Sequence, residues 1–232
     1  MMRSLAVLLV LSACAAPPPP RHVATIPTPH AGAEERNALL ADRALLAEAP
    51  LIFLGDSITE GWEGAGALVW TERLAPLGAL DLGVSGDRTE HLLARLQSGD
   101  YDRLPVRVAV VLIGTNNLGA GHTPEHTADG VRAVLDDVLA RWPSCRVLLL
   151  GIFPRGAQPD DPLRAAVAAT NVLLREVADR DRVTWLEFGG AFLSPGGILS
   201  PGVMPDALHL SQHGYAIWAD AQEEPLGRML GP

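Results

Sequence analysis

Short, mostly apolar runs alternate with longer amphipathic stretches along most of the chain. Each run is closely followed by a turn or loop, and the runs are Leu51 to Leu54, Leu80 to Leu82, Val106 to Ile113, Val147 to Ile152 and Val183 to Leu186. Continuous apolar segments separated by helices are typical of parallel strands buried on both faces. The pattern therefore predicts a parallel sheet.

The stretches between these runs have the period of amphipathic helices. Thr89 to Leu96 places its leucines on one face, and Pro124 to Ala140 does the same with its valines. Thr123 and Asp161 each precede a proline and are predicted N-caps. Further helices are predicted over residues 36–46, 163–178 and 215–230. The result is a single-domain, three-layer α/β/α doubly wound fold, with ligands expected at the carboxyl ends of the strands.

The first residues have the pattern of an export signal. Arg3 precedes an almost wholly apolar run over residues 4–11, which is too short to span a bilayer. The run Leu11-Ser-Ala-Cys14 resembles a bacterial lipobox, in which the cysteine is acylated and becomes the mature N-terminus. We therefore expect a signal peptide over residues 1–13 and a lipid anchor at Cys14. An ordinary signal peptide cleaved nearby, with Cys14 incidental, is the alternative.

Residues 14–33 are rich in proline, with four in succession from Pro17. Such a tract favours an extended spacer. It would hold a folded domain, residues 34–232, away from a membrane. The expected product is an exported, membrane-anchored lipoprotein of the bacterial cell envelope, facing the periplasm or the cell surface. His22 and His30 lie in this predicted spacer.

Composition and charge narrow the possible partners. The 232 residues are 48% hydrophobic and 19% charged, as in ordinary soluble globular proteins. A net charge of −9 disfavours nucleic acid. The chain contains no lysine, which excludes Schiff-base and P-loop lysine chemistry. Cys145 is the one cysteine besides Cys14, so we expect it to be buried and structural.

Four polar segments collect where strands end or the last helix begins. A serine in a strand-to-helix turn is suited to nucleophilic attack, an asparagine amide can donate to an oxyanion, and Asp-x-x-His brings a carboxylate beside an imidazole. The pattern G-x-S-x-G of α/β-hydrolases is missing. The segments are Gly55-Asp-Ser57-Ile, Gly83-Val-Ser-Gly86-Asp-Arg, Gly114-Thr-Asn116-Asn and Asp206-Ala-Leu-His209.

Together and in this order, these segments resemble the conserved blocks of the SGNH (GDSL-type) superfamily of esterases and lipases. The similarity runs from about Leu51 to the C-terminus and is closest to the branch of the platelet-activating-factor acetylhydrolase catalytic subunits. It implies a flavodoxin-like sheet, Ser57 as nucleophile, His209 as general base and Asp206 as its orienting carboxylate. It also implies an oxyanion hole made by the Ser57 N–H, the Gly86 N–H and the Asn116 amide. No metal or cofactor is required.

The resemblance implies hydrolysis of short-chain, acetyl-type esters through an acyl-serine intermediate. The substrate is expected to be a small-molecule or polymer-borne acyl ester, on lipid or carbohydrate, with a broad arylesterase or thioesterase as a further option. A shallow acyl pocket is expected near Ile58 and Leu208. A homodimer is one possible assembly. The alternative function is a non-catalytic, envelope-anchored binding lipoprotein on a hydrolase scaffold.

Three further features are assigned structural roles. His122-Thr-Pro-Glu-His126 matches the zinc pattern H-x-x-E-H, but a helix capped by Thr123 leaves His122 outside it, so the two imidazoles cannot share a helical face. His91 and His213 flank predicted helices and are expected at the surface. The tryptophans are expected in the core rather than in a sugar-binding platform.

Overall fold

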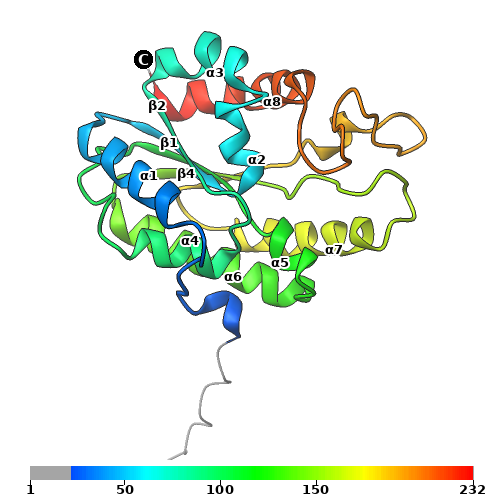
Figure 1. Ribbon diagram of the computed structural model, residues 1–232, viewed down its shortest axis with the longest axis horizontal. Coiled ribbons are helices and arrows are strands. Elements are labelled where there is room, and N and C mark those ends of the chain that lie inside the picture. Colours follow the sequence, from blue (N-terminus) through cyan, green and yellow to red (C-terminus); the bar gives the residue numbers. More distant parts are fainter. Residues whose placement is uncertain (1–21, 232) are drawn as a thin grey trace, which may run out of the picture.

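The computed structural model describes residues 22–231, which form one parallel five-stranded sheet between two layers of helices (Figure 1). The strands follow the order β2-β1-β3-β4-β5, and all neighbouring pairs are parallel. Their bounds are β1 Leu51–Gly55, β2 Ala79–Gly83, β3 Val108–Leu112, β4 Arg146–Leu150 and β5 Val183–Leu186. The predicted fold class is confirmed, because this is the flavodoxin-like strand order.

Alternate residues of the central strands enter two separate cores. In β1, Leu51 and Phe53 pack on one side of the sheet, whereas Ile52 and Leu54 pack on the other. All four side chains are fully buried. Continuous apolar runs are therefore needed here, because both sheet faces are covered by helices.

The helices divide between these two faces, as Figure 1 shows. One layer holds α1 (Glu34–Leu46), α4 (Thr89–Leu96), α6 (Pro124–Arg141) and α7 (Pro162–Val177); the other holds α3 (Ala67–Arg73) and α8 (Gln212–Leu230). The short helices α2 (Ser57–Glu60) and α5 (Thr115–Gly119) follow β1 and β3 directly. Single 3-10 turns occur at Val23–Thr25 (η1), Gly61–Glu63 (η2), Ala75–Leu77 (η3) and Gly189–Phe192 (η4).

The predicted helix starts are confirmed by their caps. Thr123 Oγ1 accepts a hydrogen bond from the His126 N–H at 3.2 Å, and Asp161 Oδ1 accepts one from the Leu163 N–H at 2.9 Å. Each side chain satisfies a first-turn N–H that the helix itself leaves free. Cys145 is fully buried, as expected. No helix within residues 22–231 is both long and apolar enough to cross a membrane.

The interpretation of residues 14–33 as a free spacer is wrong for its second half. Residues 22–33, called the N-terminal strap below, pack on the domain (Figure 1). Ala24 is fully buried, its carbonyl accepts a hydrogen bond from Thr89 Oγ1 at 2.9 Å, and the Thr28 N–H donates to the Glu90 carbonyl at 3.0 Å. The domain therefore begins at least as early as His22. Residues 1–21, which include Cys14 and the predicted signal peptide, lie outside the described part of the chain.

The expectation of a surface position for His91 is also wrong. Its side chain is buried, because the strap covers the start of α4 where it lies. His213 is exposed, as predicted.

Candidate functional site

The carboxyl ends of β1 and β3 form the point where successive connections leave the sheet in opposite directions. In a doubly wound fold ligands bind at such a point. Gly55 at the end of β1 is in register with Gly83 of β2 and Leu112 of β3. The loops that start after these three residues therefore begin at the same level of the sheet. They carry Ser57, Gly86 and Asn116.

Ser57 is the first residue of α2, two positions beyond the end of β1. The turn needs glycine, because a Cβ on Gly55 would lie 2.4 Å from the Leu112 carbonyl oxygen. A Cβ on Gly83 would lie 2.1 Å from the Glu60 nitrogen. The two glycines thus let α2 sit directly on the ends of the strands. Asp56 caps the helix by accepting a hydrogen bond from the Ile58 N–H at 3.0 Å.

Asp56 is fully buried directly before the serine. Burial raises the pKa of its carboxyl to about 7, Asp87 raises it further, and the Ile58 N–H opposes this shift. Its Oδ1 accepts the capping bond, whereas its Oδ2 has no hydrogen-bond partner among the described residues. A carboxyl with this pKa is partly protonated near neutral pH and can then donate from its second oxygen.

A chain of hydrogen bonds joins Ser57, His209 and Asp206. Ser57 Oγ lies 2.9 Å from His209 Nε2, and His209 Nδ1 lies 2.7 Å from Asp206 Oδ2. With Nδ1 donating to the carboxylate, Nε2 is free to accept from the serine hydroxyl. Ser57 and His209 are 152 residues apart in sequence, so this contact is created by the fold.

The Asp206 carboxylate is oriented by its own turn. Oδ1 accepts hydrogen bonds from the N–H groups of His209 and Leu208, at 2.7 and 3.1 Å. Partial burial would raise the pKa of Asp206, but the hydrogen bonds from the imidazole and these two N–H groups outweigh it and lower the pKa to about 2. Ala207, which follows Asp206, has φ +60°, a strained value for a residue with a Cβ. This conformation belongs to the turn that brings the side chains of Asp206 and His209 together.

Gly86 and Asn116 both line a groove of about 530 Å³. The strap contributes Thr28, Pro29, His30 and Ala31 to its lining. Gly86 has φ +80°, which glycine adopts without strain. Asn116 Nδ2 donates to the Asp87 carbonyl at 3.0 Å, so the second hydrogen of this amide remains available to a ligand.

Asp87 is a residue whose importance the sequence did not reveal. It is fully buried, its Oδ2 accepts from Arg95 Nε at 2.8 Å, and its Oδ1 lies 2.9 Å from His30 Nδ1. It follows Gly86 directly and accepts the Asn116 bond, so it connects two of the predicted oxyanion-hole residues. Asp87 lies in the segment Gly83-Val-Ser-Gly86-Asp-Arg, but nothing in that segment indicated a contact with His30, 57 residues away.

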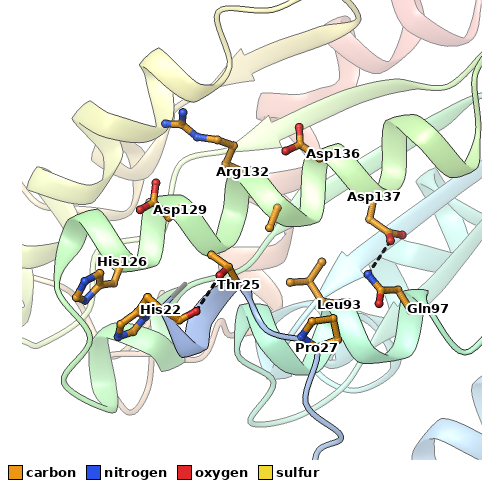
Figure 2. A pocket seen from close by; sticks show the side chains of 11 residues that line it. His22, Thr25, Pro27, Leu93, Gln97, His126, Asp129, Arg132, Asp136 and Asp137 are labelled. Atoms are coloured by element: carbon orange, nitrogen blue, oxygen red, sulfur yellow. Dashed lines mark hydrogen bonds between the residues drawn. The ribbon is translucent and has the colours of Figure 1, made fainter. Parts of the chain in front are cut away.

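Histidines also cluster beside α6. His22 of the strap stacks on His126 with ring centroids 3.6 Å apart and meets the edge of His122 at 4.9 Å. Thr123 caps α6 as predicted, so His122 precedes the helix. Figure 2 shows His22 and His126 at one end of a hollow of about 820 Å³ between the strap, α4 and α6. None of the predicted site residues lines this hollow.

One group of potential metal ligands occurs in the described chain, formed by His30, Asp87 and His91. The potential ligand atoms already form hydrogen bonds. The Asp87 carboxylate binds His30 and Arg95, and His91 Nδ1 accepts a hydrogen bond from the Arg88 N–H at 3.2 Å. Two guanidinium groups at this cluster disfavour a further cation. We assign it to hydrogen bonding.

The aromatic residues near the site are mostly structural. Trp62 and Trp218 are fully buried and pack on each other with ring centroids 4.8 Å apart, which confirms the prediction of a core role. Ile58 is buried in the same core, while Leu208 is half-buried. The acyl pocket expected between these two residues stays a prediction.

Comparison with known proteins gives a consistent set of relatives. The sequence model of the GDSL-like Lipase/Acylhydrolase family matches residues 53–217. Platelet-activating factor acetylhydrolase IB subunit alpha1 of Bos taurus is 36% identical over 184 residues, which cover 79% of this chain and 77% of the bovine protein.

Solved structures show the same fold at lower identity. A GDSL-like lipase from Bacteroides thetaiotaomicron aligns with a TM-score of 0.68 and 19% identity, over 84% of this chain and 97% of that one. An acetyl xylan esterase aligns with a TM-score of 0.64 and 20% identity, over 76% of this chain and 98% of that one. The matched family segment contains Ser57, Gly86, Asn116, Asp206 and His209.

Proposed function

Since this chain belongs to the GDSL-like lipase/acylhydrolase family and is a carboxylic ester hydrolase, we propose that it removes short acyl groups, acetyl above all, through an acyl-serine on Ser57. The observation that carries the proposal is the line of contacts from Ser57 Oγ through His209 to Asp206, at 2.9 and 2.7 Å. The alternative of a non-catalytic binding protein does not account for this arrangement.

The first half of the reaction acylates the serine. His209 Nε2 takes the proton as Ser57 Oγ attacks the ester carbonyl, and the Asp206 carboxylate stabilises the resulting imidazolium. The carbonyl oxygen becomes an oxyanion, which accepts hydrogen bonds from the Ser57 N–H, the Gly86 N–H and the free hydrogen of the Asn116 amide. The intermediate collapses, the ester C–O bond breaks, and His209 returns the proton to the departing alcohol.

The second half restores the enzyme. A water molecule loses a proton to His209 Nε2 and attacks the acyl carbon, with the oxyanion bound as before. The bond to Ser57 Oγ then breaks, the serine recovers its proton from His209, and a carboxylic acid leaves. Both half-reactions balance with water as the only co-substrate.

Acetyl esters are the substrate class that the relatives support best. The bovine relative is named an acetylhydrolase and one structural neighbour an acetyl xylan esterase. One name specifies platelet-activating factor and the other xylan, but both specify the acetyl group. We therefore propose acetyl as the acyl group, and the alcohol part of the ester is to be identified by screening.

Hydrolysis of p-nitrophenyl acetate, butyrate and octanoate by the purified full chain tests this proposal. We expect the rate to fall with chain length and to vanish in Ser57→Ala. Ser144→Ala is the matched control, because that serine is exposed in a loop before β4. Activity that survives in Ser57→Ala, or a rate that rises from acetate to octanoate, would contradict the proposal.

We also propose that the protein is exported and anchored through Cys14. The proposal rests on the apolar run before Leu11-Ser-Ala-Cys14. Metabolic labelling with a radioactive fatty acid should mark the wild-type protein and not Cys14→Ala. Equal labelling of the two proteins, or none in either, would refute the anchor without affecting the esterase proposal.

A further inference from the structure

The N-terminal strap packs against α4 and α6 of the domain. Figure 2 shows Thr25 and Pro27 over the hollow between α4 and α6. Buried Ala24, the hydrogen bond from the Thr89 hydroxyl to its carbonyl, and the main-chain bond from Thr28 to Glu90 attach the strap to the first turn of α4. That turn directly follows the Gly86-Asp87 loop. The strap is thus attached next to the predicted oxyanion hole.

His30 is the strap residue that contacts this loop. Its Nδ1 lies 2.9 Å from Asp87 Oδ1, with side-chain exposures of 22% for His30 and zero for Asp87. The ring also packs against Gly86, where a Cβ would lie 3.0 Å from His30 Cε1. The His91 ring stacks on the His30 ring with centroids 4.4 Å apart. The imidazole is therefore fixed between α4 and the loop.

The contact between His30 and Asp87 matters because Asp87 also binds Arg95 and Asn116. Its Oδ2 is bound by Arg95 and its main-chain carbonyl accepts from Asn116 Nδ2. His30 is the partner of the remaining oxygen, because His91 Nδ1 is 4.0 Å away and already accepts the Arg88 N–H. Without His30, a buried carboxylate oxygen would lack a hydrogen bond, and that costs stability at this loop.

We propose that His30 is a positioning residue for ester hydrolysis, which holds the Gly86 N–H and the Asn116 amide in place through Asp87. This inference rests on the proposed function of the Ser57 site. His30 does not touch the reacting atoms in this role. It acts on the geometry of the donors, which must match an oxyanion that exists only during the reaction.

Loss of the His30 side chain should affect turnover rather than substrate binding. Loss of a complete oxyanion donor costs about 100 to 1,000-fold in kcat. His30 orients donors that remain present, so we expect His30→Ala to lower kcat about ten-fold, with KM changed less than about two-fold. Concentrations of active enzyme should come from titration of Ser57 with a fluorophosphonate, so that misfolded protein does not count.

Two conservative variants separate the hydrogen bond from simple packing. Asparagine carries an N–H donor at the position of Nδ1, whereas glutamine carries it near the position of Nε2. His30→Asn should therefore recover most of the lost kcat, and His30→Gln should resemble His30→Ala. Ile26→Ala, an exposed position of the same strap, is the control and should match the wild type.

Hydrogen exchange supplies a readout independent of activity. The Asp87 N–H donates to the Val84 carbonyl at 3.1 Å, and its exchange should speed up in His30→Ala but not in Ile26→Ala. An unchanged kcat per titrated site, a rise in KM alone, or a His30→Asn variant no better than His30→Gln would overturn the inference. Unchanged exchange over residues 84–88 would overturn it as well, even for an enzyme without ester activity. Absence of activity in the wild type would instead overturn the proposed function.

Discussion

The side-chain amide of Asn116 donates to the main-chain carbonyl of Asp87 at 3.0 Å, whereas that of the adjacent Asn117 is buried under α4. Asn117 accepts from the Thr89 N–H and donates to Thr89 Oγ1 and Glu90 Oε2, each at 3.0 Å. Two neighbouring asparagines therefore have different tasks. Asn116 keeps one amide hydrogen free at the groove, and Asn117 holds α5 to the start of α4.

Substitution of the two asparagines should separate catalysis from stability. Asn116→Ala is expected to lower kcat about 100 to 1,000-fold with little change in thermal stability, because it removes a donor from the proposed oxyanion hole. Asn117→Ala is expected to lower the free energy of unfolding by about 2 kcal/mol, because it leaves buried polar groups without partners. Steady-state kinetics and denaturant unfolding of both variants check this. Equal losses of kcat would refute the division.

Asp206→Asn should impair turnover without preventing folding. An amide cannot stabilise the imidazolium and favours the wrong tautomer of His209, a change that typically costs about 10⁴-fold. The Asp206 side chain is 57% exposed, so water can replace part of its effect, and we expect roughly a 10³-fold loss of kcat. Asp160→Asn, at an exposed loop position, is the control. A loss below ten-fold would argue against the role of Asp206.

Asp81 should make the protein less stable as the pH rises. Burial raises the pKa of its carboxyl from 3.8 to about 7, the Gly83 N–H opposes this shift, and nearby Glu63 adds to it. Below pH 3.8 the group is protonated in both states, and between pH 4 and 7 the folded state alone keeps the proton. Stability contributed by this group is therefore fully present at low pH and lost as the pH rises toward 7.

Asp81→Asn should remove this dependence, since asparagine keeps the acceptor for the Gly83 N–H, which lies 2.8 Å from Oδ1. We expect the difference in free energy of unfolding between Asp81→Asn and the wild type to grow in favour of the variant by on the order of 4 kcal/mol between pH 4 and pH 8. Urea unfolding across this pH range is the measurement, with the exposed Asp100→Asn as control. An advantage that is constant with pH would exclude the assigned pKa.

Two glycine substitutions should have opposite effects. Gly83→Ala would place a Cβ 2.1 Å from the Glu60 nitrogen and force α2 away from the strand ends, so we expect a loss of about 3 kcal/mol or more and reduced activity. Gly227 lies within α8 with no atom near its would-be Cβ. Gly227→Ala should stabilise the protein by about 0.5 to 1 kcal/mol. Thermal unfolding compares both variants, and a neutral Gly83→Ala would refute the steric account.

The sheet and most helix positions could be predicted because local pattern and tertiary burial agree. The runs at Leu51 to Leu54 and Val147 to Ile152 form buried strands, and α4 spans the residues that its periodicity indicated. Ser57 and His209 were singled out by the resemblance of their segments to the SGNH blocks, and the structure brings the two side chains into contact. Their contact distance could not be obtained from the sequence, because it depends on a long loop before α8.

The docked strap could not be predicted for a physical reason. Proline restricts a chain to extended and turn conformations, but it does not determine whether that chain packs on a surface. The binding of residues 22–33 depends on hydrogen bonds to the Thr89 hydroxyl and the Glu90 carbonyl and on the ring of His30. These groups carry no periodic signal. Burial of His91 was missed for the same reason, because the strap is what covers it.

The docked strap also shortens any tether between an anchor and the enzyme. Only eight residue steps separate Cys14 from His22, and a fully extended chain of that length spans about 30 Å. If the chain were free as far as Ala33, the span would be about 65 Å. For a protein acylated at Cys14, the active site would then sample a volume roughly ten-fold smaller, and esters at the membrane surface would meet it at a correspondingly higher effective concentration.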